Sequence, residues 1–228
     1  MSLLTGLQAY YKLDSGALTT DASGNGKTLT NIGSTTNGTA FLGTGSASFD
    51  HTNTHALQIT DSLGYTTGGD TTVSAWMQFN AWTGAFNIDI STAGGGGKRC
   101  LIYTGNFKRI SVYNSGNLVD STNLFDTGIW YHTVLTISNG ATSLYVNTNL
   151  EATTTQGSTT GDTNGFAIGN AYDSTGAESN GLIDEVGVWN RILSSTEISQ
   201  LYNSGAGLPF SSFGGGVVTN PAFLLNFV

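Results

Sequence analysis

Charged residues are scarce in this sequence of 228 residues: they make up only 10% of it, and four of the 15 acidic residues are glutamates. An ordinary soluble domain contains about 25% charged residues, and a solvated coiled coil contains more. The seven Lys and Arg residues are spread along the chain and form no basic patch, which argues against nucleic acid as a partner. No apolar run approaches the roughly 18 residues of a membrane span, so we expect no membrane insertion.

Cysteine is nearly absent as well, since Cys100 is the only one and cannot form an intrachain disulfide. It lies in the apolar run 100–103, which predicts a buried, inert thiol. The N-terminus shows neither the basic region nor the apolar region of a signal peptide. We therefore expect the chain either to act where it is made or to leave the cell by another route, for example as part of a virus particle.

Glycine, threonine, serine and asparagine are abundant and together make up about half of the chain. Short runs in which polar and apolar residues alternate are separated by turns, five of which contain an Asn-Gly pair. The clearest predicted strands are 72–79, 86–90, 109–112, 130–137 and 143–146. This pattern predicts an all-β antiparallel sandwich. We expect Trp76 and Trp130 to be core residues, and Leu182, Val186 and Val188 to point inward from one strand.

One segment has a helical pattern instead. Ser194 and Glu197 have the spacing of a capping box, and apolar residues follow on one face. We predict a short helix over 195–204, packed on the sheets.

The composition changes after Pro209, where a Gly-rich link leads to an apolar end that contains Phe223, Leu224, Leu225 and Phe227. We therefore divide the chain into a domain at 1–209 and a docking tail at 210–228. Because an apolar end is expected to be covered, the tail should dock on its own domain, on another copy in a homo-oligomer, or on other virion proteins.

Seven segments resemble, in order, the motifs of one family. They are 7–14 (LQAYYKLD), 21–26 (DASGNG), 47–50 (ASFD), 72–77 (TVSAWM), 130–134 (WYHTV), 144–147 (LYVN) and 181–194 (GLIDEVGVWNRILS). The family that they resemble is the laminin-G-like, concanavalin-A-like jelly roll, and the resemblance spans residues 7 to about 208. It implies two antiparallel sheets packed face to face, and it does not include the tail.

Glucan hydrolases of this superfamily use two carboxylates in an E-x-D-x-x-E pattern on one strand, which this sequence lacks. Asp184 and Glu185 are neighbours, and we expect them to point to opposite faces of a strand. His51 and His55 have no third zinc ligand in view, and His132 is expected to pack within its strand. We therefore predict no catalytic residues and no enzymatic activity.

Calcium is the predicted cofactor. Asp21 and Asn25 offer oxygen ligands in one turn. The resemblance implies that Asp184, from a late strand, would complete the site. The alternative is that Asp21 caps its own turn and Asp184 binds backbone groups, and the sequence leaves both interpretations open.

Carbohydrate binding requires an aromatic face with polar groups beside it. We select Trp82, in a turn-like segment, and Tyr172 with Asp173, at the start of a polar loop. Tyr103 and Tyr113 are further options. The alternative is that each ring packs at a sheet edge and that the loop acids are only solvated.

These features favour a non-enzymatic protein on the surface of a virion, namely a phage decoration, head-fibre or tail-associated protein that binds host glycans. Two alternatives remain open: a purely architectural capsid or tail subunit without glycan binding, and a secreted lectin-like adhesion module.

Overall fold

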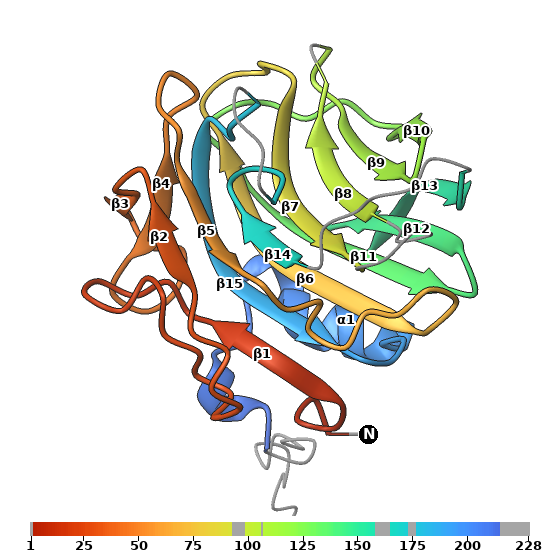
Figure 1. Cartoon of the computed structure of the whole chain (residues 1–228), viewed down its shortest axis with the longest axis horizontal. Coiled ribbons are helices and arrows are strands. Elements are labelled where there is room, and N and C mark those ends of the chain that lie inside the picture. The colour runs from red at the N-terminus through yellow and green to blue at the C-terminus, as the bar shows by residue number, and fades with distance from the viewer. Residues whose placement is uncertain (1, 93–98, 106, 158–164, 173–176, 215–228) are drawn as a thin grey trace, which may run out of the picture.

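The computed structural model of the chain describes residues 2–92, 99–105, 107–157, 165–172 and 177–214 (Figure 1). The strands are β1 (Leu7–Tyr11), β2 (Thr30–Ile32), β3 (Thr36–Gly38), β4 (Ser46–Phe49), β5 (Ala56–Ile59), β6 (Thr71–Phe79), β7 (Ala85–Ser91), β8 (Arg99–Thr104), β9 (Ile110–Asn114), β10 (Asn117–Asp120), β11 (Trp130–Ser138), β12 (Ala141–Val146), β13 (Asn149–Thr155), β14 (Gly165–Ile168) and β15 (Gly181–Trp189). One α-helix, α1 (Ser195–Tyr202), is followed by the short 3-10 turns η1 (Asn203–Gly205) and η2 (Phe210–Ser212).

The described strands form two antiparallel sheets. The eight-stranded sheet has the order β13-β12-β11-β6-β15-β4-β3, and β1 also pairs with β15. The seven-stranded sheet has the order β10-β9-β8-β7-β14-β5-β2 and lies in front in Figure 1. The predicted two-sheet sandwich with one short C-terminal helix is confirmed.

The main core lies between the sheets and follows the period of two that a strand imposes on its side chains. From β6, Val73, Ala75 and Met77 point into it, and from β8 Cys100 and Ile102 do so. Cys100 is buried, as predicted, and burial raises the pKa of its thiol to about 12.

The alternation fails in β15, and two of our expectations were wrong there. The pairing of β15 with β6 shifts between Asp184 and Gly187, and Glu185 has a φ of +51°. This β-bulge adds a residue on the outer side of the sheet, so that Ile183 and Val186 point into the core and Leu182 does not. Asp184 and Glu185 both lie on the outer face instead of opposite faces.

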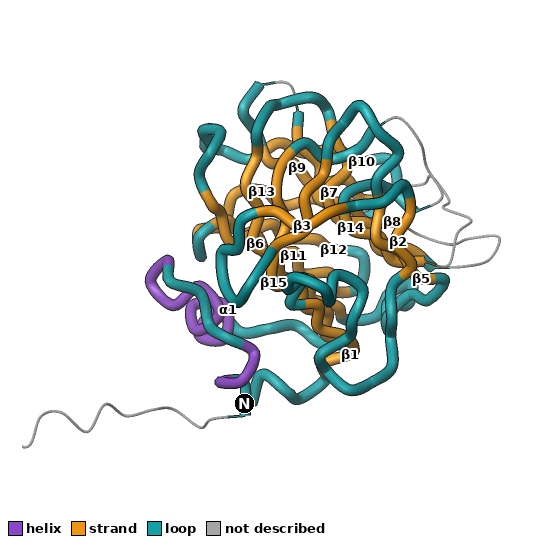
Figure 2. The backbone as a smooth tube through the Cα atoms, turned by 90° about the vertical axis from the view of Figure 1, so that its left-hand side faces the viewer, coloured by secondary structure: helices purple, strands orange, loops and turns teal. Residues whose placement is uncertain are grey.

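A second core covers the outer face of the eight-stranded sheet. Trp189 packs there with Tyr10. Leu193, just before α1, and Ile198 and Leu201, within α1, complete this core. Figure 2 shows α1 and the two 3-10 turns together on one side of the sandwich. The capping box at the start of α1 is confirmed, with the Ser194 side chain accepting from the Glu197 backbone N–H and the Glu197 side chain accepting from Ser194 N.

The two tryptophans predicted for the main core are placed differently. Trp76 is buried on the outer face of the eight-stranded sheet, where its ring stacks on Phe41 at 3.8 Å and on Tyr202 at 5.9 Å. Trp130 is only half-buried and packs beside Phe41 at 5.4 Å. The reason is the register: Val73, Ala75 and Met77 face the main core, so Trp76 must face away from it.

The first residues of the predicted tail pack on the sandwich. Phe213 is 2% exposed, and its ring contacts Tyr10 at 5.0 Å and Trp189 at 6.3 Å. Ser2 donates a hydrogen bond to the carbonyl of Phe213, so both ends of the described chain meet there. The apolar positions Phe223, Leu224, Leu225 and Phe227 lie outside the described residues.

Candidate functional site

The outer face of the seven-stranded sheet carries aromatic and polar side chains in two neighbouring rows. In the first row, Phe86 lies opposite Tyr103, Tyr103 opposite Ser111, and Ser111 opposite Asp120. In the second row, Asp89, Leu101, Tyr113 and Leu118 lie opposite one another in turn. Since the intervening residues of these strands face the main core, both rows face outward.

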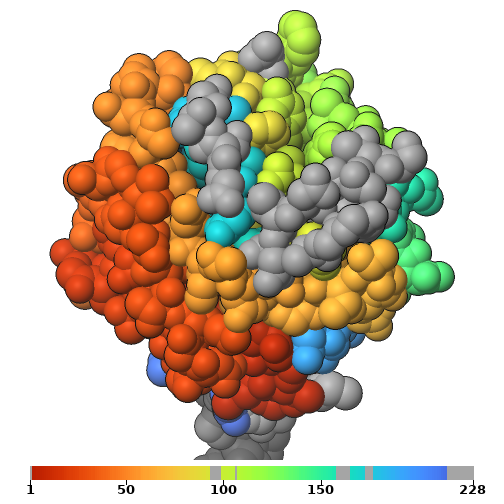
Figure 3. Space-filling model, in the orientation of Figure 1, coloured from red at the N-terminus to blue at the C-terminus, as the bar shows by residue number. Residues whose placement is uncertain are grey.

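Five of these residues form what we call the outer platform: Phe86, Tyr103, Tyr113, Leu118 and Asp120. The three rings are half-buried, and Leu118 and Asp120 are exposed. The Phe86 and Tyr103 rings are 5.5 Å apart, and the Ser111 hydroxyl donates to Asp120 over 2.6 Å. Figure 3 shows residues of β8 and β9 reaching the surface on this side of the molecule. A sugar ring can stack on such aromatic faces while its hydroxyls bind the polar groups.

A β-bulge places Phe86 on this surface. The pairing of β7 with β8 shifts between Phe86 and Ile88, so that Asn87 is the extra residue. Strict alternation would put Phe86 on the same side as Ile88 and Ile90, both of which are in the main core. Phe86 was therefore not predicted from the sequence, whereas Tyr103 and Tyr113 were options.

A buried ion pair adjoins the outer platform. The Asp89 carboxylate lies 3.2 Å from Arg99 Nε and accepts a hydrogen bond from the backbone N–H of Tyr172 over 2.7 Å. Arg99 also donates to the Tyr172 carbonyl over 3.0 Å. Burial raises the pKa of Asp89 to about 7, while the charge of Arg99 acts in the opposite direction. These contacts hold β7, β8 and the segment after β14 together beneath the surface.

The carbohydrate candidates Tyr172 and Trp82 are packed more deeply than we expected. Tyr172 is 8% exposed, and its hydroxyl shares a hydrogen bond of 2.6 Å with Thr60. Trp82 is half-buried and packs on Phe79 with the ring centroids 5.0 Å apart. Asp173 lies outside the described residues. Sugar contact by these three residues remains a prediction, and the half-buried rings of Tyr103 and Tyr113 are more accessible than that of Tyr172.

The predicted calcium ligands of the N-terminal turn are engaged with the backbone. Asp21 accepts hydrogen bonds from the N–H groups of Tyr10, Ser23 and Lys27 at 2.9–3.1 Å. These bonds hold the pKa of Asp21 below its usual value, against the effect of burial. The Asn25 amide nitrogen donates to the Leu7 and Gln8 carbonyls.

The third predicted ligand, Asp184, also binds backbone groups. Its carboxylate accepts from the N–H groups of Phe41 and Leu42 at 2.9 and 3.1 Å and from that of Glu185 at 3.0 Å. Burial raises the pKa of Asp184 to about 8 although these donors oppose the shift. Within the described ranges, no three His, Cys, Asp or Glu side chains are grouped as a metal site. The hydrogen bonds match the backbone-binding alternative, and calcium remains a prediction.

His132 and Ser74 form a buried pair that resembles part of a hydrolase site. The Ser74 hydroxyl lies 2.8 Å from His132 Nε2, but Nδ1 of the same imidazole has no hydrogen-bond partner among the described residues. Both residues are buried, and the Tyr202 ring stacks over the imidazole at 6.2 Å. Burial lowers the pKa of His132 to about 3, so the ring is neutral. These contacts agree with the packing role expected for His132.

The described strands form a two-sheet antiparallel sandwich, which is the architecture of lectin-like jelly-roll domains. The sequence profile of the concanavalin A-like lectin/glucanases superfamily matches residues 43–199. The chain belongs to this superfamily. No curated protein matches the sequence.

Several solved structures share the fold. Domain 4 of AbnA, a GH43 extracellular arabinanase from Geobacillus stearothermophilus solved with arabinotriose, has a TM-score of 0.66 at 20% identity, over 85% of this chain and 96% of that one. Trypanosoma rangeli sialidase in complex with sialic acid has a TM-score of 0.66 at 16% identity, over 90% of this chain and 34% of that one. The binding domain of Paraclostridial Mosquitocidal Protein 1 has a TM-score of 0.66 at 14% identity, over 89% and 53%. The chain thus spans about a third of the sialidase and about half of the toxin domain.

In the part of the chain that the structure describes, no helix has the length and apolar character that a membrane crossing requires.

Proposed function

We propose that this protein is a non-enzymatic glycan-binding domain and that the outer platform is its binding surface. The observation that carries the proposal is the row of Phe86, Tyr103, Ser111 and Asp120, in which two half-buried rings lie beside an exposed carboxylate that accepts from the buried Ser111 hydroxyl. Sugar binding needs this combination, because the C–H face of the ring is apolar while its edge carries hydroxyls. The AbnA domain, which has the same fold, was solved with arabinotriose.

The spacing of carboxylates on this face supports a binding role. Asp89 lies on β7 and Asp120 on β10, three strands away in the order of the sheet. At about 4.8 Å per strand, and because they lie in different rows, they are at least about 14 Å apart. The two acids of a glycosidase are about 5–9.5 Å apart, so these cannot act together on one glycosidic bond.

The test compares two tyrosine variants. A glycan array, read with and without calcium, first identifies a ligand, and titration calorimetry then measures its affinity. Tyr103→Ala and Tyr113→Ala should each weaken binding about three- to tenfold, because loss of one stacked ring costs about 0.5–1.5 kcal/mol. Tyr145→Ala is the matched control, since Tyr145 is a half-buried tyrosine on the opposite sheet.

The outcomes separate the candidate functions. If thermal melting shows that both platform variants are folded and their affinity for the glycan is unchanged, the binding site lies elsewhere on the domain. No binding to any glycan under either condition would favour the architectural role. Calcium is proposed as a stabilising ion, so its addition should raise the melting temperature and chelation should lower it.

Attachment to a virion through the tail is a second proposal. It is supported by the apolar sequence at Phe223, Leu224, Leu225 and Phe227, which needs a covering surface. Deletion of residues 215–228 should abolish incorporation into particles and leave the domain folded, because Phe213 stays in place. Particles that still contain the truncated protein would refute the tail as an anchor.

A further inference from the structure

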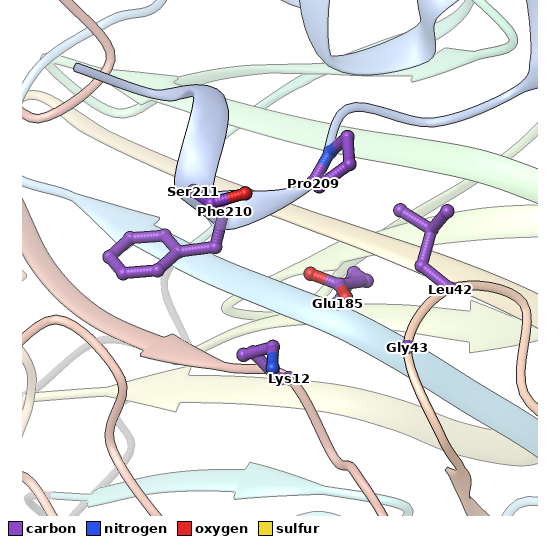
Figure 4. A pocket seen from close by; sticks show the side chains of 7 residues that line it. All are labelled: Lys12, Leu42, Gly43, Glu185, Pro209, Phe210 and Ser211. Atoms are coloured by element: carbon purple, nitrogen blue, oxygen red, sulfur yellow. The ribbon is translucent and has the colours of Figure 1, made fainter.

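A pocket of about 260 Å³ lies on the opposite side of the sandwich from the outer platform. Figure 4 shows its lining residues around one opening: Lys12, Leu42, Gly43, Glu185, Pro209, Phe210 and Ser211. They come from the residue after β1, the loop before β4, the bulge of β15, and η2 with the residue before it. The proposed glycan binding on the outer platform uses none of these residues.

Unusual backbone lies at one charged residue of the pocket and directly after the other. Glu185 is the bulge residue at φ +51°, and it is only 4% exposed. The Tyr10 hydroxyl donates to one oxygen of its carboxylate. Lys12 precedes Leu13, which also has a positive φ, of +54°. Such conformations cost about 1–3 kcal/mol each and persist where the surroundings or a function require them.

The remaining walls are mostly apolar. The Phe210 ring stacks on Tyr10 at 4.7 Å with 22° between the planes, which orients it rigidly. Leu42 and Pro209 add apolar surface, and Ser211 contributes a hydroxyl. Lys12 forms an ion pair with Asp14, but an ammonium group has three donors, so it can also bind a ligand.

This set of groups selects among ligand classes. An anion would meet the buried Glu185 carboxylate, a cation would meet the Lys12 ammonium, and a purely apolar molecule would cover both polar groups without adding a hydrogen bond to either. A neutral sugar fits, because its hydroxyls can donate to Glu185 and accept from Lys12 while its C–H face lies on Phe210.

We propose that this pocket binds one uncharged sugar unit, such as the terminal residue of a glycan, as a second site. The Leu42–Gly43 wall and the Pro209–Ser211 wall enclose a volume suited to one ring and not to a long chain. The inference rests on the proposed function in that the ligand is a carbohydrate. Because the two sites lie on opposite sheets, one molecule bridges two glycans.

The test uses free monosaccharides as probes: L-arabinose, D-xylose, D-glucose, D-galactose and N-acetyl-D-glucosamine, with D-glucuronic acid and D-glucosamine as charged probes. Saturation-transfer NMR should detect at least one neutral sugar and neither charged sugar. Lys12→Met and Glu185→Gln should each weaken that binding about tenfold, since the first removes a charged donor and the second replaces a carboxylate acceptor by a neutral amide. Lys27→Met is the matched control, because Lys27 also pairs with an aspartate, Asp61, but does not line the pocket.

Two further readouts keep the result interpretable. If Glu185→Gln does not fold, amide chemical-shift mapping on the unmodified protein should show the sugar perturbing Gly43 and Ser211. No neutral monosaccharide binding, or shifts confined to the outer platform, would overturn the pocket proposal. If the pocket proposal fails in this way but Tyr103→Ala still loses oligosaccharide binding, the outer platform remains the glycan-binding surface. The pocket proposal and the proposed function can therefore fail separately.

Discussion

At the scale of single residues, several acidic side chains of this protein are held in place by hydrogen bonds from backbone N–H groups. Asp21 and Asp184 each accept three such hydrogen bonds, and Glu197 accepts from the N–H of Ser194. A protein with only 15 acidic residues thus uses several of them to hold turns and strand ends. The same residue types could bind a cation, and only their hydrogen-bond geometry distinguishes the two roles.

The capping box provides a prediction at this scale. Ser194→Ala should lower the free energy of unfolding by about 1 kcal/mol, because the N-cap hydroxyl that accepts from the Glu197 N–H is lost. Ser195→Ala is the control: the next residue is exposed, and its substitution should change stability by less than about 0.5 kcal/mol. Urea unfolding followed by circular dichroism measures both. Equal effects of the two changes would refute the role of the cap.

At the scale of elements, two β-bulges decide what the outer faces display. The bulge in β7 turns Phe86 outward onto the outer platform, and the bulge in β15 places Glu185 in the pocket. Each bulge inverts the side that simple alternation assigns to a residue. Both proposed sites therefore depend on a β-bulge. Bulges are common beside functional sites, where they change the direction of a side chain.

The C-terminal segment provides the prediction at this scale. Phe213 is buried against Tyr10 and Trp189, so Phe213→Ala should lower the free energy of unfolding by about 3–5 kcal/mol. A chain that ends at Gly214 should retain the melting temperature of the full chain, and one that ends at Leu208 should lose several degrees or more. Differential scanning calorimetry of these three proteins is the measurement. A stable chain ending at Leu208 would show that 209–214 is dispensable.

At the scale of the whole molecule, the buried carboxylates predict an unusual pH dependence of stability. Burial raises the pKa of Asp89 to about 7, of Asp184 to about 8 and of Glu185 to about 7. Between the ordinary carboxyl pKa near 4 and these values, the folded state binds more protons than the unfolded state, so stability falls as the pH rises. Glu197 acts in the other direction: hydrogen bonds and the Arg191 charge lower its pKa to about 2, and its contribution is lost as the pH falls from about 4.5 to 2.

Buried His132, whose pKa is about 3, adds stability as the pH rises to about 6.5, but the three carboxylates outnumber it, so we expect maximal stability near pH 4–5 and a decrease toward pH 8. The urea midpoint at a series of pH values measures this. Asp89→Asn removes one of the titrating groups, and its profile should be flatter between pH 5 and 7. A midpoint that rises from pH 5 to 8 would contradict the expectation.

The arrangement of the sheets separates two candidate binding surfaces. The outer platform belongs to the seven-stranded sheet, and the pocket lies over the eight-stranded sheet, where η2 forms one wall. On the outer face of the eight-stranded sheet, α1 and the segment that contains η2 create a second core as well as a pocket. The seven-stranded sheet presents its aromatic rings directly on its outer face.

Several parts of this architecture were readable from the chain. The alternating runs predicted β6, β7, β11 and β12 to within a few residues, and the Ser194–Glu197 spacing predicted the start of α1. These features depend on local chemistry: side-chain alternation in strands and hydrogen bonding at a helix end. Tyr103 and Tyr113 were selected for the same reason, as aromatic residues in short strands.

The sequence by itself determined the fold class, the superfamily motifs, the capped helix and the buried Cys100, because each is written in neighbouring residues. Only the tertiary structure decided that Trp76 faces away from the main core, that Asp184 and Glu185 share one face, and that Phe86 joins Tyr103 on the outer platform. The physical reason is register. Which side of a sheet a residue occupies depends on pairing with distant strands, and one extra residue in a bulge reverses it.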